Sequence, residues 1–146
     1  GFTTGRQEIV DLLRQESRPY LFSNAIAPSI ANAGLKVLEM LQENDERREK
    51  IWENARYFRS EMEDRGFDIK PGDHPIVPIM LYDAKISGAV ADALLDRGIY
   101  VISFSYPVVP EGEARIRVQM SAAHSKEQLD RAIDAFTEVG RKHDVI

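Results

Sequence analysis

The hydrophobic pattern of this chain changes period at Pro71-Gly72, and that change constrains the fold more than any other feature. Beyond it, short apolar runs alternate with segments of helical spacing. They predict strands at 76–81, 99–104 and 114–120, and helices at 84–97 and from Ser125 onward. Because only a short loop links the second and third strands, these two must be antiparallel neighbours. We therefore expect a β-α-β-β-α unit of α+β class, a small antiparallel sheet covered by helices.

The first half of the chain is helical in pattern and has almost no strand. Helical spacing predicts helices at 8–15 and 28–42, with a brief extended stretch at 20–23 between them. Asn44 is the predicted N-cap of a third helix that ends at Gly66. Charged residues concentrate just after this point, so we place a boundary there and expect one unit at 1–44 and another at 45–146.

Composition excludes several classes of function. The chain has 146 residues, and its 19 basic against 24 acidic residues give a net charge of −5, which argues against nucleic-acid binding. It has no cysteine, so disulfide scaffolds and zinc ribbons are excluded, and its three histidines lack metal-ligand spacing. No apolar run approaches the roughly 18 residues of a membrane span. We expect no metal site, and neither nucleic acid nor membrane as a partner.

The predicted strand at 114–120 carries the most informative local pattern. A period of two places Arg115, Arg117 and Gln119 on one face, and apolar residues on the other. An arginine fork can grip a carboxylate or phosphate with two hydrogen bonds. The pattern by itself favours a solvated face or an ion pair over such an anion site.

Two further segments allow both a structural and a functional interpretation. The aromatic and proline-rich loop 104–110 is either a stiff surface turn or one wall of a binding cleft. Ser23 and Asn24 precede the helix that starts at Pro28. Their pattern favours local capping, and the alternative is a hydrogen bond to an anion near the helix start.

Several blocks resemble a known family. They are Arg18-Pro19-Tyr20-Leu21-Phe22-Ser23-Asn24, Ser105-Tyr106-Pro107-Val108-Val109-Pro110, Ala114-Arg115-Ile116-Arg117 and Met120-Ser121-Ala122-Ala123-His124. The chain resembles the α-oxoamine synthases, which are pyridoxal-phosphate enzymes that join an amino acid to an acyl-CoA. The resemblance covers the whole of this chain, but only the C-terminal third of such an enzyme. The resemblance implies an aspartate-aminotransferase-like fold. Residues 1–44 would be the edge of the cofactor-binding large domain with the interdomain helix, and 45–146 the small C-terminal domain.

The resemblance also assigns roles to individual residues. It implies that Arg117 holds the carboxylate of the amino-acid substrate and that Ser23 and Asn24 reach the cofactor phosphate of the partner subunit, so that a homodimer shares its active sites. Arg115 is expected to be structural. None of the lysines has the context of the family's Schiff-base lysine, so no catalytic residue is expected in this chain. Tyr82 stands where the family usually has glycine, which suggests a local change of turn.

The activity implied for an intact enzyme is the condensation of glycine with acetyl-CoA to 2-amino-3-oxobutyrate and CoA, in threonine catabolism. The alternatives are another family member, such as an 8-amino-7-oxononanoate synthase, or a regulatory or interaction module without catalysis. The resemblance covers only a C-terminal portion and the Schiff-base lysine is absent, so we expect this chain to be inactive alone. The expected location is cytoplasmic, or mitochondrial for a eukaryotic source.

Overall fold

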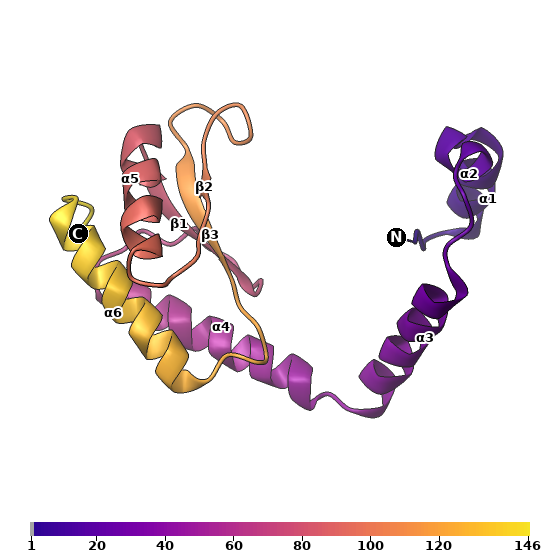
Figure 1. Cartoon of the computed structure of the whole chain (residues 1–146), viewed down its shortest axis with the longest axis horizontal. Helices are drawn as coiled ribbons and strands as arrows, with labels where there is room; N and C mark the ends of the chain where they lie inside the picture. The colour runs from indigo at the N-terminus through magenta and orange to yellow at the C-terminus, as the bar shows by residue number, and fades with distance from the viewer. Residues whose placement is uncertain (1) are drawn as a thin grey trace. The chain divides into compact units, whose positions relative to one another are not determined.

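The computed structural model describes residues 2–146, and these form two compact units that divide between Asn44 and Asp45. The first unit contains α1 (Gln7–Glu16), α2 (Arg18–Phe22) and α3 (Pro28–Glu43). The second contains α4 (Glu46–Asp64), β1 (Ile76–Tyr82), α5 (Ala84–Leu95), β2 (Ser103–Phe104), β3 (Ala114–Gln119) and α6 (Lys126–Lys142) (Figure 1).

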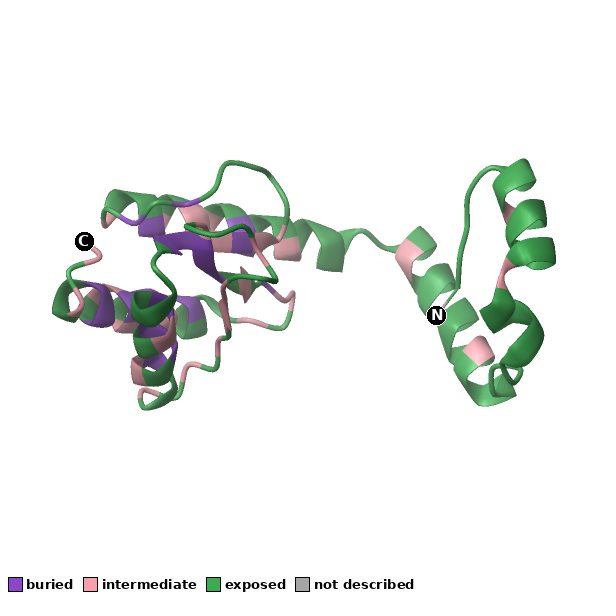
Figure 2. Cartoon of the chain, turned by 90° about the horizontal axis from the view of Figure 1, so that it is seen from above, coloured by how far each residue is buried: buried purple, intermediate pink, exposed green. Residues whose placement is uncertain are grey.

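The first unit corrects one prediction from the sequence. The stretch 20–23, expected to be extended, lies mostly in helix α2. Helix α1 ends at Glu16, because Ser17 is extended, and Pro19 occupies the first turn of α2, where its fixed φ suits a new helix. No described residue of this unit is buried, and its helices are almost entirely exposed in Figure 2.

The second unit confirms the predicted β-α-β-β-α order. Its sheet has the strand order β1-β3-β2, and β3 pairs antiparallel with both neighbours. The second strand is much shorter than the predicted 99–104, because only Ser103 and Phe104 pair with β3. The N–H of Ile99 donates instead to the carbonyl of Leu94 and closes the end of α5. The segment 99–102 therefore runs beside the sheet without extending it.

The core of the second unit lies between the sheet and helices α4, α5 and α6, which contact one another or the strands. Three aromatic rings form its centre. Phe136 meets Phe58 and Phe67 edge to face, each with a centroid separation of 6.2 Å. From the sheet, Val77, Ile79 and Ile116 are fully buried against this cluster.

The observed starts of α6 and α4 agree only in part with the starts predicted from the sequence. The last helix starts after Ser125 as predicted, and a capping box with both reciprocal hydrogen bonds joins Ser125 and Gln128 there. The predicted N-cap at Asn44 is wrong, because Asn44 ends α3 in an extended conformation and α4 begins at Glu46. Asp45 takes the cap position and pairs with Arg48 through its side chain rather than capping the backbone.

Helices α4 and α6 are also joined by a hydrogen bond from the Tyr57 hydroxyl to the Asp130 carboxylate. This bond, with partial burial and the negative charge, raises the pKa of Tyr57 to about 12. The phenol therefore stays protonated, and keeps donating to Asp130, at alkaline pH values where a free tyrosine would ionise.

Tyr82 has a φ of 64°, in the left-handed region, at a position where the resembled family usually has glycine. A register irregularity separates it from Met80, and its hydroxyl donates to Asp68. The residue thus adopts a backbone conformation that glycine adopts at lower cost.

Gly140 in α6 is required by close packing. A Cβ built there would lie 2.7 Å from Cζ of Phe67, inside the contact limit. We expect Gly140→Ala to lower the free energy of unfolding by about 1–3 kcal/mol, the usual cost of overpacking, in urea titrations followed by circular dichroism. Gly88→Ala in α5 is the matched control, since a Cβ there meets nothing within 4 Å. It should be neutral or gain up to about 1 kcal/mol from helix propensity. Equal effects at the two glycines would contradict this explanation.

Candidate functional site

The two arginines of β3 are on one face of the sheet, as the alternation predicts, but their surroundings differ. Arg115 is only 9% exposed. Its Nε and one terminal nitrogen donate to the carbonyl and the carboxylate of Glu113, at 3.0 and 2.7 Å. Arg115 is therefore held in an ion pair, as a structural role requires.

Arg117, by contrast, is exposed. Within residues 2–146 it makes no hydrogen bond or ion pair with another side chain or carbonyl. Its guanidinium carbon lies 4.0 Å from the centre of the Phe104 ring. A cation on a ring face uses no N–H group, so the donors of Arg117 are available to an anion.

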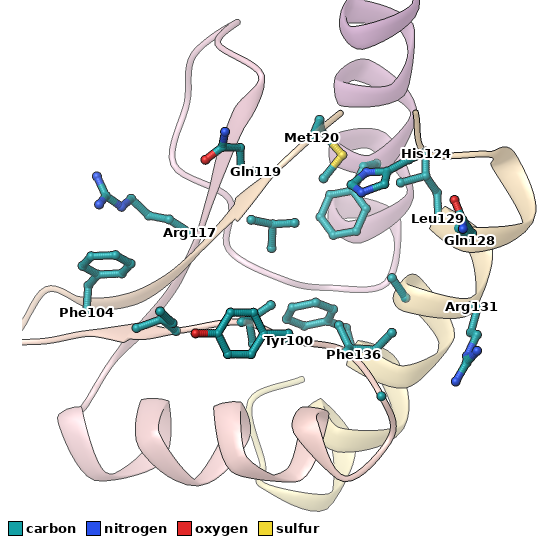
Figure 3. Close-up of a pocket in the computed structure, with 17 residues that line it drawn as sticks. Tyr100, Phe104, Arg117, Gln119, Met120, His124, Gln128, Leu129, Arg131 and Phe136 are labelled. Carbon is teal, nitrogen blue, oxygen red and sulfur yellow. The ribbon is translucent and has the colours of Figure 1, made fainter. Parts of the chain in front are cut away.

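An open cavity of about 630 Å³ lies beside Arg117. The unpaired segment 99–102 and residues 117–119 at the end of β3 line part of it. Figure 3 shows Arg117 and Phe104 together at one end of the cavity, and Gln128 and Arg131 at the other. The buried rings of Phe58 and Phe136 line its inner wall. The cavity is thus mostly apolar, with an arginine at each end.

The loop that follows β2 folds into a turn. The N–H groups of Val108 and Val109 both donate to the carbonyl of Ser105, and the peptide bond between Tyr106 and Pro107 is cis. Tyr106 and Val108 are exposed. The stiff turn expected from the prolines is present, and its role as a wall of a binding cleft stays a prediction.

One residue that supports this region was missed by the sequence reasoning. Asn54 of α4 is 3% exposed, and its amide donates to the carbonyls of Ser121 and His124, at 2.9 and 3.1 Å. It anchors the connection that follows β3. The available signal was a polar residue among the apolar positions of α4, four residues before Phe58. Nδ1 of His124 accepts from the Ser121 N–H at 3.3 Å, so this histidine helps to hold the same connection.

Ser23 and Asn24 belong to the first unit. Ser23 ends α2, and its N–H donates to the carbonyl of Pro19. Both residues are exposed. The hydroxyl and amide are accessible donors of the kind that bind phosphate, so the residues fit that role without establishing it.

Residues 2–146 contain neither a metal-binding cluster nor a membrane-spanning helix. No group of three or more His, Asp or Glu side chains in that range could hold a metal ion. Nor is any helix there long and apolar enough to cross a membrane.

Comparison with known proteins identifies the family. The family description "aminotransferase class I and II" matches residues 1–136. The chain belongs to this aminotransferase family. Within it, the chain is 53% identical over all its 146 residues to the "2-amino-3-ketobutyrate coenzyme A ligase" of Escherichia coli K12. It is 47% identical over the same length to the "8-amino-7-oxononanoate synthase" of Thermosipho melanesiensis. These relatives confirm the resemblance drawn from the sequence blocks.

In both comparisons the chain spans 37% of the relative's length. A solved structure of the aminotransferase-like fold, described as SPT with PLP, superposes with a TM-score of 0.89. It is 29% identical, and the match covers 98% of this chain and 36% of that structure. The predicted fold class is thereby confirmed.

Proposed function

We propose that this chain is the C-terminal part of a pyridoxal-phosphate enzyme that condenses glycine with acetyl-CoA, a glycine C-acetyltransferase. In this proposal Arg117 binds the glycine carboxylate, and Ser23 and Asn24 bind the cofactor phosphate across a homodimer. The observation that carries the proposal is Arg117, which has no anionic partner among the described residues although its neighbour Arg115 has one. The relatives at 53% identity are named for 2-amino-3-ketobutyrate and coenzyme A, and these names support the substrates of the proposal.

The side chains present fit a cofactor held in part by other residues. Ser23 and Asn24 are exposed donors that suit a phosphate. All six lysines, in contrast, are exposed, and four of them lie beside Glu39, Glu53, Glu113 or Tyr57. An imine-forming lysine is commonly activated by an apolar pocket or by a neighbouring cation that lowers its pKa. We infer that this chain contributes contacts to the cofactor and no covalent link.

The chemistry that pyridoxal phosphate supplies when bound is the uptake of negative charge from the amino-acid Cα. The role of this chain is orientation. Two parallel hydrogen bonds from the Arg117 fork would hold both carboxylate oxygens and so fix the direction of the Cα–H bond. Correct orientation of bound reactants is worth several kcal/mol in rate.

A second member of the same family is the alternative. The 8-amino-7-oxononanoate synthase relative is only six percentage points less identical than the closer group, 47% against 53%. A carboxylate clamp at Arg117 would serve either enzyme, because both proposals require an amino-acid substrate. The acyl chain distinguishes them.

Release of CoA thiol tests the proposal directly. The full-length polypeptide that contains this chain, loaded with pyridoxal phosphate, should release CoA from acetyl-CoA only when glycine is present, and more slowly from longer acyl-CoA thioesters. The 146-residue chain by itself should release none. A preference for long acyl chains would favour the alternative, and no amino-acid-dependent release from any thioester would contradict both. Release by the chain alone would show that no further lysine is needed.

A further inference from the structure

We propose that Phe104 is a positioning residue for the substrate carboxylate, because its ring holds the guanidinium of Arg117 in place. This inference rests on the proposed function and adds to it a residue that touches no substrate atom. It begins with the contact of 4.0 Å between the guanidinium carbon and the ring centre.

The sheet register brings these two side chains together. Phe104 of β2 is the direct cross-strand partner of Arg115 in β3. Arg117 lies two residues further along β3, on the same face, and is therefore the diagonal neighbour of Phe104. Aromatic and long side chains can reach each other across such a diagonal. The contact thus follows from backbone pairing that includes the last residue of β2.

The two arginines on this face are held by different means. Arg115 is held by the carboxylate and the carbonyl of Glu113, which occupy its N–H groups. The Glu113 carboxylate also lies 3.9 Å from the Lys70 ammonium. Arg117 is held by a ring face, which occupies none of its N–H groups. Of the two, only Arg117 is restrained and still able to bind a carboxylate with two hydrogen bonds.

Restraint matters because an exposed arginine has many rotamers. Freezing a long side chain when a ligand binds costs affinity, and a side chain that is already held loses less. The interaction free energy between the ring and the guanidinium should be that of a typical exposed cation–π contact. Its loss should weaken glycine binding about two- to five-fold, without removing the carboxylate clamp.

Substitution of Phe104 in the full-length holoenzyme tests the inference. Phe104→Leu keeps an apolar side chain and removes the ring, so the glycine KM should rise about two- to five-fold while the KM for acetyl-CoA and kcat change little. Phe104→Tyr keeps the ring face, so its glycine KM should stay close to that of the unsubstituted enzyme. In an Arg117→Ala background, Phe104→Leu should add nothing, because the residue acts through Arg117.

A spectroscopic readout needs no enzyme activity. In the labelled 146-residue chain, the ring of Phe104 should shift the side-chain proton resonances of Arg117 upfield, and the shift should be lost in Phe104→Leu and kept in Phe104→Tyr. Unchanged Arg117 resonances in Phe104→Leu would overturn the inference. So would an equal rise in glycine KM with and without Arg117. Absence of glycine-dependent CoA release from the unsubstituted enzyme would contradict the proposed function, whereas the resonance shift would still report on the ring contact.

Discussion

Replacing Arg117 by alanine in the full-length holoenzyme should lower kcat/KM for glycine by about 30- to 1000-fold. The physical reason is the loss of two charge-assisted hydrogen bonds to the carboxylate, together worth about 2–4 kcal/mol. Each 1.4 kcal/mol corresponds to a tenfold change in rate. The KM for acetyl-CoA should change little, because the proposed clamp binds the amino acid. Steady-state kinetics with each substrate varied in turn measures both effects.

Two further variants separate geometry from charge. Arg117→Lys keeps the charge and loses the planar fork, so its kcat/KM for glycine should lie between those of Arg117→Ala and the unsubstituted enzyme. Arg56→Ala removes an exposed positive charge from α4 and serves as the control for a general change in net charge. If Arg117→Ala and Arg56→Ala had the same small effect on glycine, Arg117 would not be the carboxylate clamp.

The face of β3 could be predicted from sequence, but the state of each arginine on it could not. A period of two assigns side chains to faces without saying which charge meets which. Here Glu113, two residues before Arg115, pairs with Arg115 and leaves Arg117 without an anion among the described residues. Of the two structural alternatives, Arg115 forms the ion pair and Arg117 lies on a solvated face. The distinction depends on a side-chain contact that the pattern does not encode.

The cavity was also outside the reach of sequence patterns. The apolar run at 99–104 predicts a strand, and the prediction fails for 99–102 because Ile99 completes the end of α5. Competition between a helix end and a sheet edge is decided by three-dimensional geometry. The unpaired segment 99–102 lines the cavity beside Arg117. Phe104, at the last paired position of β2, could not be linked to Arg117 before the register was known.

The first unit shows what periodicity can and cannot establish. Helical spacing predicted α1 and α3 nearly to their ends, but no local pattern identified α2, which depends on Pro19 starting a turn. Apolar side chains of these helices are largely exposed. Leu12, Leu21 and Leu35 are 60%, 76% and 59% exposed. Roles for Ser23 and Asn24 came only from family resemblance, since two exposed polar residues have no distinctive pattern.

Replacing Phe136 by alanine should have the largest effect on the stability of the second unit. The side chain is 1% exposed and makes two edge-to-face ring contacts. Truncation of a buried phenylalanine typically lowers the free energy of unfolding by about 3–5 kcal/mol, through lost burial and the cavity left behind. Domains of this kind are stable by only about 5–15 kcal/mol. The variant should therefore unfold at a much lower urea concentration, measured by the fluorescence of Trp52 in α4.

A leucine at the same position separates burial from ring geometry. Phe136→Leu retains most of the apolar volume and loses both ring contacts, each worth about 0.5–1.5 kcal/mol beyond area burial. Phe136→Leu should therefore lower the free energy of unfolding by about 1–3 kcal/mol, which is less than Phe136→Ala does. Because Phe136 also lines the cavity beside Arg117, a loss below about 1 kcal/mol for alanine would mean that neighbouring groups collapse into the vacated space. In that case the aromatic cluster would not be the centre of the core, and the cavity wall would be easily deformed.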